Sequence, residues 1–260
     1  MALPYEVFIG LRYLKAKRKQ TFISIITFIS IAGVAVGVMA LIVVLSVMTG
    51  FHEDLRDKIL GTNSHIVITS YGQRMKNFED VVSTVQKNKD VSAATPFIYS
   101  QVMLTSEKNV TGVVVRGIDP EREAKVTKVS SNMSQGSLAD LLPSADNAVP
   151  GIVVGKELSR MLGVFYGEEI NIVSPLGNMT PLGMVPRMKK FRVVGIFDSG
   201  MYEYDTSLAY IVLSEAQSFF NMEEEVTGVE VRVTDFFNAQ LVAKELKASL
   251  GYGYSVRDWM

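Results

Sequence analysis

The run TFISIITFISIAGVAVGVMALIVVLSVMTG occupies residues 21–50, and no Asp, Glu, Lys, Arg or His stands between Gln20 and Phe51. The hydrocarbon core of a bilayer is about 30 Å thick, so a helix of roughly 20 apolar residues crosses it. Residues 21–48 alone exceed that length, and a helix satisfies its own backbone hydrogen bonds in lipid. This stretch predicts a transmembrane helix at the start of the chain.

A cleaved signal peptide and a buried core helix are the alternatives for this run. The apolar region of a signal peptide has about 7–15 residues and ends at a small-x-small site. Here the run is longer, and its small residues lie in its middle, at positions 32, 33, 35 and 37. A core helix of a soluble protein has a polar face, which this run lacks. We therefore expect an uncleaved anchor.

Basic residues gather directly before the run, within residues 1–20. They are Arg12, Lys15, Lys17, Arg18 and Lys19. Lys and Arg close to a span favour the cytoplasmic side, so we expect a cytoplasmic N-terminus and, in a bacterial inner membrane, a periplasmic main domain. Residues 4–18 read either as an amphipathic helix on the cytoplasmic membrane surface or as a solvated basic flank.

The span, predicted over 21–50, contains Gly33 and Gly37 in a G-x-x-x-G spacing, which lets helices pack closely but is also frequent by chance. Residues 51–61 keep helical spacing, with Phe51, Leu55 and Ile59 four residues apart, and Gly61 is placed to end the helix. We expect a stalk helix there.

The rest of the chain predicts an α+β domain. Strands are expected at 66–69, 91–105, 110–117, 151–155, 169–174, 191–197, 208–213, 228–233 and 254–259. Helices are expected at 78–87, 156–162, 214–220 and 236–249, and residues 119–147 read as polar and irregular. The order of elements suggests one split α+β subdomain, 62–118 with 226–260, interrupted by a β-rich insertion, 119–225.

Composition and motifs argue against several function classes. The chain has no Cys and two His, so neither a disulfide framework nor a multi-histidine metal site is expected, and no cofactor is predicted. Residues after 50 hold 21 basic and 26 acidic side chains, a balance that argues against nucleic acid as a partner. No phosphate-binding loop, nucleophile elbow or H-E-x-x-H motif occurs. We expect no enzyme activity.

One acidic segment is a candidate for acid–base catalysis. Asp198, Glu203 and Asp205 lie close together in the segment FDSGMYEYD. Two carboxylates can do acid–base work, but a solvated acidic loop is the favoured interpretation.

The most unusual outer segment is SPLGNMTPLGMVPRMKK at residues 174–190. Its prolines and glycines favour a stiff hairpin between two strands. Its apolar side chains suit a partner site, and Met suits adaptable recognition, although they can also fold back onto the domain. Those side chains are Leu176, Met179, Leu182, Met184, Val185 and Met188.

Several blocks resemble the lipoprotein-releasing permease family, the LolC/LolE type of the MacB-like ABC transporter superfamily. They are FIGLRY at 8–13, GVMAL at 37–41, LSVM at 45–48 followed by Gly50 and Phe51, ILG at 59–61, and TPLG at 180–183 with Pro186. The likeness covers essentially the whole chain, and the hairpin block is similar to the LolC-like member.

This resemblance implies a permease subunit that releases lipoproteins from the inner membrane and passes them to a periplasmic carrier of the LolA type. It also implies a separate ATPase of the LolD type, a second permease subunit, and an outer domain made of Porter-like and Sabre-like parts. The hairpin would be a hook that enters the carrier. The hook residues would be Pro181, Leu182, Gly183, Met184, Val185 and Pro186, and the candidates for a basic pad are Arg187, Lys189 and Lys190.

The substrate is expected to be a lipoprotein, whose acyl chains need an apolar path. One face of the outer half of the span is a hypothesis for that path, with contact to membrane lipid as the alternative. Its members are Met39, Val43, Val47 and Met48.

The family has four transmembrane helices and this sequence predicts one, so we expect an N-terminal fragment. The alternative function is a single-span sensor or a division-complex scaffold of the FtsX-like type, without transport. A membrane-anchored hydrolase is a third class, and no nucleophile–base pair supports it.

Overall fold

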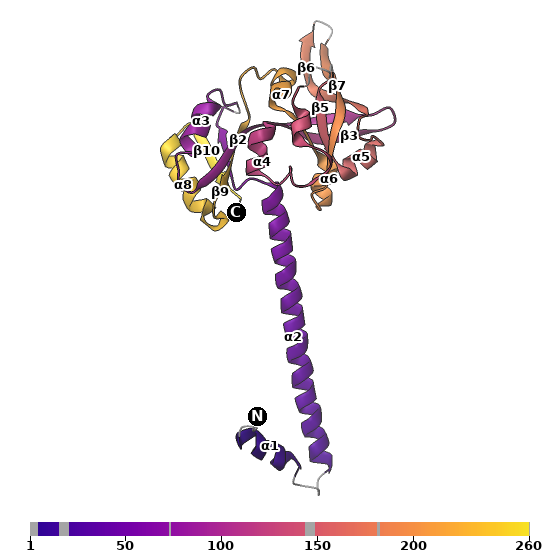
Figure 1. Cartoon of the computed structure of the whole chain (residues 1–260), viewed down its shortest axis with the longest axis vertical. Helices are drawn as coiled ribbons and strands as arrows, with labels where there is room; N and C mark the ends of the chain where they lie inside the picture. The colour runs from indigo at the N-terminus through magenta and orange to yellow at the C-terminus, as the bar shows by residue number, and fades with distance from the viewer. Residues whose placement is uncertain (1–4, 16–20, 73, 144–148, 181–182, 260) are drawn as a thin grey trace. The chain divides into compact units, whose positions relative to one another are not determined.

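The computed structural model describes residues 5–15, 21–72, 74–143, 149–180 and 183–259 (Figure 1). The chain divides into two compact units, Met1–Arg56 and Asp57–Met260. Each unit is described by itself below.

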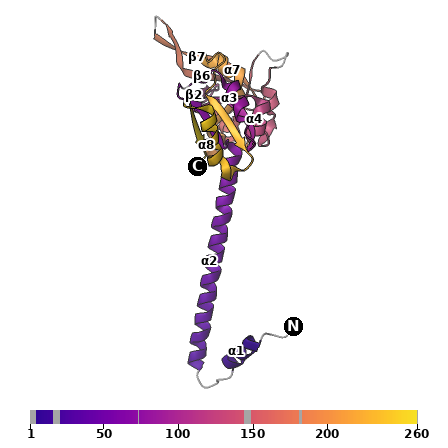
Figure 2. The ribbon, with the colours of Figure 1, turned by 90° about the vertical axis from the view of Figure 1, so that its left-hand side faces the viewer.

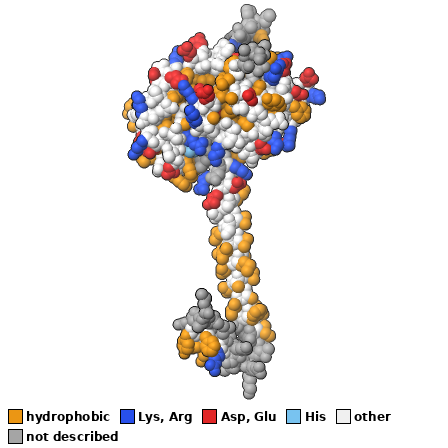
Figure 3. All heavy atoms as spheres, in the orientation of Figure 1, with side chains coloured by type: hydrophobic (Ala, Val, Ile, Leu, Met, Phe, Trp, Pro, Cys, Tyr) orange, Lys and Arg blue, Asp and Glu red, His pale blue; other side chains and the backbone are white. Residues whose placement is uncertain are grey.

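The first unit consists of helix α1 (Tyr5–Lys15) and most of helix α2 (Thr21–Thr62). Within α2, Ile25–Asp54 has a mean hydropathy of 2.8 and is long and apolar enough to cross a membrane. Figure 3 shows apolar side chains along the visible face of this helix and charged ones near its end at the second unit's side of the chain, and the sequence has no charged residue between Gln20 and Phe51. The predicted apolar helix is confirmed. The helix ends one residue after Gly61, where an end was expected.

The second unit is built on a sheet that has ten strands in the described part of the chain, in the order β10-β1-β9-β2-β3-β8-β5-β7-β4, with β6 paired to β2 and β7. The strands are β1 (Ile66–Ser70), β2 (Val91–Thr105), β3 (Val110–Ile118), β4 (Met133–Gly136), β5 (Gly151–Gly155), β6 (Glu169–Thr180), β7 (Gly183–Phe197), β8 (Leu208–Val212), β9 (Gly228–Val233) and β10 (Tyr254–Asp258).

Helices lie between these strands in chain order. They are α3 (Phe78–Val85), α4 (Pro120–Val126), η1 (Leu138–Leu141), α5 (Lys156–Leu162), α6 (Tyr202–Ser207), α7 (Leu213–Phe220), η2 (Phe236–Asn238) and α8 (Ala239–Leu250). The predicted α+β class is confirmed.

Strand β2 connects the two ends of the sheet. Its first half pairs with β9, and its second half pairs with β3 and β6. The larger buried cluster includes Ile98, Leu104 and Phe191, and a smaller one includes Ile118 and Tyr210. The boundaries between Porter-like and Sabre-like parts stay a prediction.

The expectation that residues 119–147 are irregular is wrong, because helix α4, strand β4 and helix η1 lie there. Asp119 caps α4: its Oδ1 accepts hydrogen bonds from the backbone N–H of Glu121 at 3.1 Å and of Arg122 at 3.2 Å. Pro120 stands at the first helical position, where its missing N–H costs nothing. Ser137 and Asp140 form a capping box on η1. The sequence did not predict these elements because their capping motifs are short and the residues around them are mostly polar.

The interpretation of 198–205 as a solvated acidic loop is also wrong, because Asp205 is buried on α6. Its Oδ1 accepts hydrogen bonds from the backbone N–H and the Oγ of Ser199, both at 2.8 Å. Asp198 pairs instead with Lys156, at 2.6 Å between Nζ and Oδ2. Burial raises the pKa of the Asp205 carboxyl, and the hydrogen bonds from Ser199 oppose that rise. These carboxylates hold the turn before α6.

Candidate functional site

Strands β6 and β7 form a two-stranded ribbon that extends beyond the rest of the sheet. Figures 1 and 2 both show it projecting from the body of the second unit. The strands pair from Glu169 with Arg192 out to Thr180 with Gly183, and the register shifts between Ser174 and Asn178. The strands predicted at 169–174 and 191–197 are therefore longer than expected. Most of the segment 174–190 is paired strand and not turn.

The end of this ribbon carries the predicted hook. Pro181 and Leu182 lie outside the described residues, while Gly183 and Met184 begin β7. Val185 is 53% exposed, and Pro186 is exposed beside it. Nearer the base, Met188 is 65% exposed, so it does not fold back onto the domain.

Helix α7 holds the inner part of the ribbon. The guanidinium of Arg187 donates to the backbone oxygen of Phe219 at 3.0 Å, and Lys189 forms an ion pair with Glu215. Because both residues are half-buried, these contacts fix where β7 leaves the sheet. Two of the three predicted pad residues thus also attach the ribbon to the domain.

Lys190, the third predicted pad residue, lies on the opposite side of β7 from Lys189, because successive strand residues alternate. Its Nζ is 3.0 Å from Glu169, which also accepts from Arg192 at 3.2 Å. Hydrogen bonds from Lys190 and then Arg192 lower the pKa of the Glu169 carboxyl. The predicted pad therefore presents basic groups on both sides of the ribbon, and its role stays a prediction.

The residues predicted in the span all lie on α2. Gly33 and Gly37 are one turn apart, and a Cβ added at either would meet no atom within 4 Å. Met39, Val43 and Val47 follow at intervals of four and are exposed, as is Met48. Helical spacing places the first three on one stripe. Packing of the glycines and a substrate path along this stripe stay predictions.

No group of three or more His, Asp or Glu side chains that could hold a metal ion occurs among the described residues. The distinguishing property of the β6–β7 ribbon is that it carries exposed apolar residues near its end, Val185 and Pro186, and is attached to the domain through α7.

Comparison with known proteins decides the family. The family model of the MacB-like periplasmic core domain matches residues 27–249. The chain belongs to the MacB-like periplasmic core domain family.

Two relatives of this family member are lipoprotein-releasing system transmembrane proteins LolC. The one from Neisseria meningitidis serogroup B is 37% identical over 98% of this chain and 60% of its own length. The one from Xylella fastidiosa is likewise 37% identical over 98% of this chain and 60% of its own length. The predicted resemblance to LolC/LolE permeases is confirmed. The chain spans about 60% of the length of these curated relatives.

One solved structure similar to this family member is the extracellular domain of the noncanonic ABC-type transporter YknZ from Gram-positive bacteria. It matches 74% of this chain and 99% of its own, with 12% identity and a TM-score of 0.49.

A cluster of buried charged side chains lies where α4 packs on the sheet of the second unit. Arg116 on β3 pairs with Glu230 on β9, and its Nη2 is 3.9 Å from Oε1 of Glu123 on α4. The hydroxyl of Thr127 donates to that oxygen at 3.0 Å. The Arg116 guanidinium also lies 5.8 Å from the centre of the Tyr210 ring. The cluster connects strands on both sides of β2, and sequence reasoning missed it.

Glu123 makes the stability of the fold depend on pH. Burial raises the pKa of its carboxyl to about 7, against the opposing charge of Arg116. A carboxyl whose pKa is higher in the folded than in the unfolded state binds more protons when folded, so stability falls as pH rises from about 4.5 to about 7.

Glu123→Gln is expected to remove this dependence, because the amide matches the protonated carboxyl in shape and carries no charge. At pH 8 the variant should be more stable than the parent by on the order of 1–3 kcal/mol, and at pH 4.5 the two should be nearly equal. Urea unfolding at both pH values measures the difference. Equal stabilities at pH 8 would show that folding does not raise the pKa of the Glu123 carboxyl.

Proposed function

We propose that this chain is a permease subunit of an ABC transporter that releases lipoproteins from the inner membrane. Its family and its two LolC relatives support this proposal. The helix α2 would anchor it, with the N-terminus in the cytoplasm and the second unit in the periplasm. The basic residues before the span support that orientation.

The observation that carries the finer proposal is the β6–β7 ribbon. It ends in exposed apolar residues, Val185 and Pro186, and is anchored at its base by Arg187 and Lys189. Apolar residues held in place on paired strands lose little freedom on binding. The proposed role is a hook that inserts into the apolar opening of a LolA-like carrier, so that the lipoprotein passes to it without exposing acyl chains to water.

The energy would come from a separate LolD-like ATPase, since the chain has no phosphate-binding loop. A second permease subunit, identical or related, would complete the pump. Helix α2 is one uninterrupted helix over Thr21–Thr62, and we propose that it transmits motion of the span.

Reconstitution tests this function. The assembled transporter is placed in vesicles with a labelled, acylated lipoprotein, and release into the soluble fraction is measured. Release is expected only when ATP and the soluble carrier are both present. A lipoprotein without its acylated cysteine controls for leakage. Intact assembly and ATP hydrolysis without any release would contradict the proposal and favour a scaffold without transport.

A further inference from the structure

A row of residues crosses four neighbouring strands at the base of the ribbon. Met188 on β7 is opposite Val173 on β6, Val173 is opposite Met103 on β2, and Met103 is opposite Gly112 on β3. Directly opposed residues of antiparallel strands point to the same face of a sheet. We call these four residues the apolar row. Met188 is 65% exposed and Met103 is 42% exposed, so the row faces outward.

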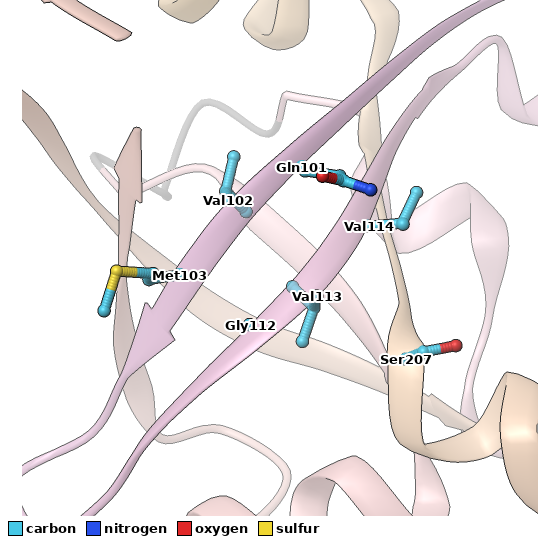
Figure 4. Close-up of a pocket in the computed structure, with 7 residues that line it drawn as sticks. All are labelled: Gln101, Val102, Met103, Gly112, Val113, Val114 and Ser207. Atoms are coloured by element: carbon cyan, nitrogen blue, oxygen red, sulfur yellow. The ribbon is translucent and has the colours of Figure 1, made fainter. Parts of the chain in front are cut away.

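The inner end of the apolar row opens into a hollow of about 330 Å³, within the size range of ligand pockets. Figure 4 shows β2 and β3 side by side at this hollow, with no side chain at Gly112. A Cβ added at Gly112 would meet no atom within 4 Å, so the glycine leaves open space. None of the lining residues is charged: they are Gln101, Val102, Met103, Gly112, Val113, Val114 and Ser207.

The apolar row is bounded on one side by polar residues. Two positions along the same strands, Lys190 is opposite Asn171, and Asn171 is opposite Thr105. These residues share the face of the apolar row, because strand side chains alternate with a period of two. The apolar surface therefore ends at the row on this side, while on the other side exposed Pro186 lies two positions from Met188 along β7.

The shape of the apolar row decides what it fits. Neighbouring strands lie about 4.8 Å apart, so the row is roughly 14 Å long. A stable protein interface buries about 800 Å² on each partner, from some 20–30 residues, which a strip of four residues cannot supply. A single hydrocarbon chain is narrow, uncharged and linear, and it matches the strip and its uncharged hollow.

We propose that the apolar row and its hollow bind an acyl chain of the lipoprotein on its way to the β6–β7 ribbon. This inference rests on the proposed function, which supplies the acylated substrate. The apolar row would hold the acyl chain transiently, because the row contacts only one side of the acyl chain. The other side of the acyl chain stays open to the carrier.

Photocrosslinking in the assembled transporter tests the inference. A photoreactive benzoyl-phenylalanine is placed at Met103, and at Met161 on α5 as a matched control, since that methionine is 47% exposed. During ATP-driven release, an adduct with the acylated lipoprotein is expected from position 103 and not from 161. The lipoprotein without its acylated cysteine should give no adduct. No adduct, equal adducts with both lipoproteins, or an adduct with the carrier alone would overturn the inference.

A substitution that fills the hollow tests the inference without a photoreactive residue. Gly112→Leu is expected to lower the release rate about tenfold, because it occupies the space of several methylene groups. Gly253→Leu, where an added Cβ also meets nothing within 4 Å, should release at the parent rate. Equal rates for the two variants would contradict the inference.

A crosslinker at Val185 separates this inference from the proposed function. An adduct between position 185 and the carrier, together with normal release and no lipoprotein adduct at 103, overturns only the acyl site. Absence of release in every arm overturns both.

Discussion

Deletion of residues 180–186 is expected to abolish binding of the carrier to the transporter. The deletion removes the end of the β6–β7 ribbon, including the exposed Val185 and Pro186. It leaves Arg187 and Lys189, which attach the ribbon to α7. A few buried apolar residues carry most of the binding energy of an interface. Removing them should therefore abolish carrier binding even though the rest of the ribbon stays attached.

Point variants make this expectation sharper. Val185→Asp is expected to weaken carrier binding roughly 30-fold, equivalent to about 2 kcal/mol, because it forces a carboxylate into an apolar opening. Val110→Asp is the matched control, since Val110 is also an exposed strand valine, 57% exposed against 53% for Val185. It should bind like the parent. Titration of the detergent-solubilised transporter with labelled carrier measures both constants.

Carrier binding unchanged by the deletion would refute the hook. Equal weakening by both valine variants would point to a general electrostatic effect and not to insertion of the ribbon. Lipoprotein release measured on the same variants shows whether binding and transfer fail together.

Arg116→Leu is expected to destabilise the second unit by about 3–5 kcal/mol, because it leaves Glu230 buried without its partner. Arg116 and Glu230 are both buried, and Glu123 is a second carboxylate near the same guanidinium nitrogen, Nη2, at 3.9 Å. The double variant Arg116→Leu with Glu230→Leu removes both charges, so it should recover much of this loss. Urea unfolding of the whole chain in detergent measures each free energy of unfolding.

Arg122→Leu serves as the control for this cluster. Arg122 also pairs with a carboxylate, at 2.9 Å from Glu79, but both side chains are substantially exposed. Exposed pairs contribute about 0–1 kcal/mol, so this variant should change little. A double variant of the buried pair that is as unstable as Arg116→Leu would show that packing around the guanidinium, and not its charge, holds the cluster.

Much of the secondary structure could be predicted because its signals are local. The predicted strands at 110–117, 151–155 and 228–233 match β3, β5 and β9 to within one residue. Helix α4 was missed, although Asp119 and Pro120 form a start signal, since a helix of seven residues buries too few apolar side chains to show a period.

Segment 174–190 was predicted as a stiff hairpin between two shorter strands, and most of it is paired strand. Pro175 and Pro186 argued against a strand in the sequence. In the structure the pairing stops at Ser174 with Arg187 and resumes at Asn178 with Val185, so Pro175 and Pro186 both lie in the register shift. The ribbon therefore accommodates both prolines in an irregularity, where neither has to donate a hydrogen bond between the strands.

The sequence by itself determined the apolar helix, the α+β order of elements and the family, because each depends on residues close together in the chain. Only the tertiary structure decided that Met188, Val173 and Met103 form one row, that Arg116 meets Glu230, and that Asp205 is buried. Those contacts join residues far apart in sequence. They depend on strand register, and a shift of one residue would turn every side chain of a strand to the other face.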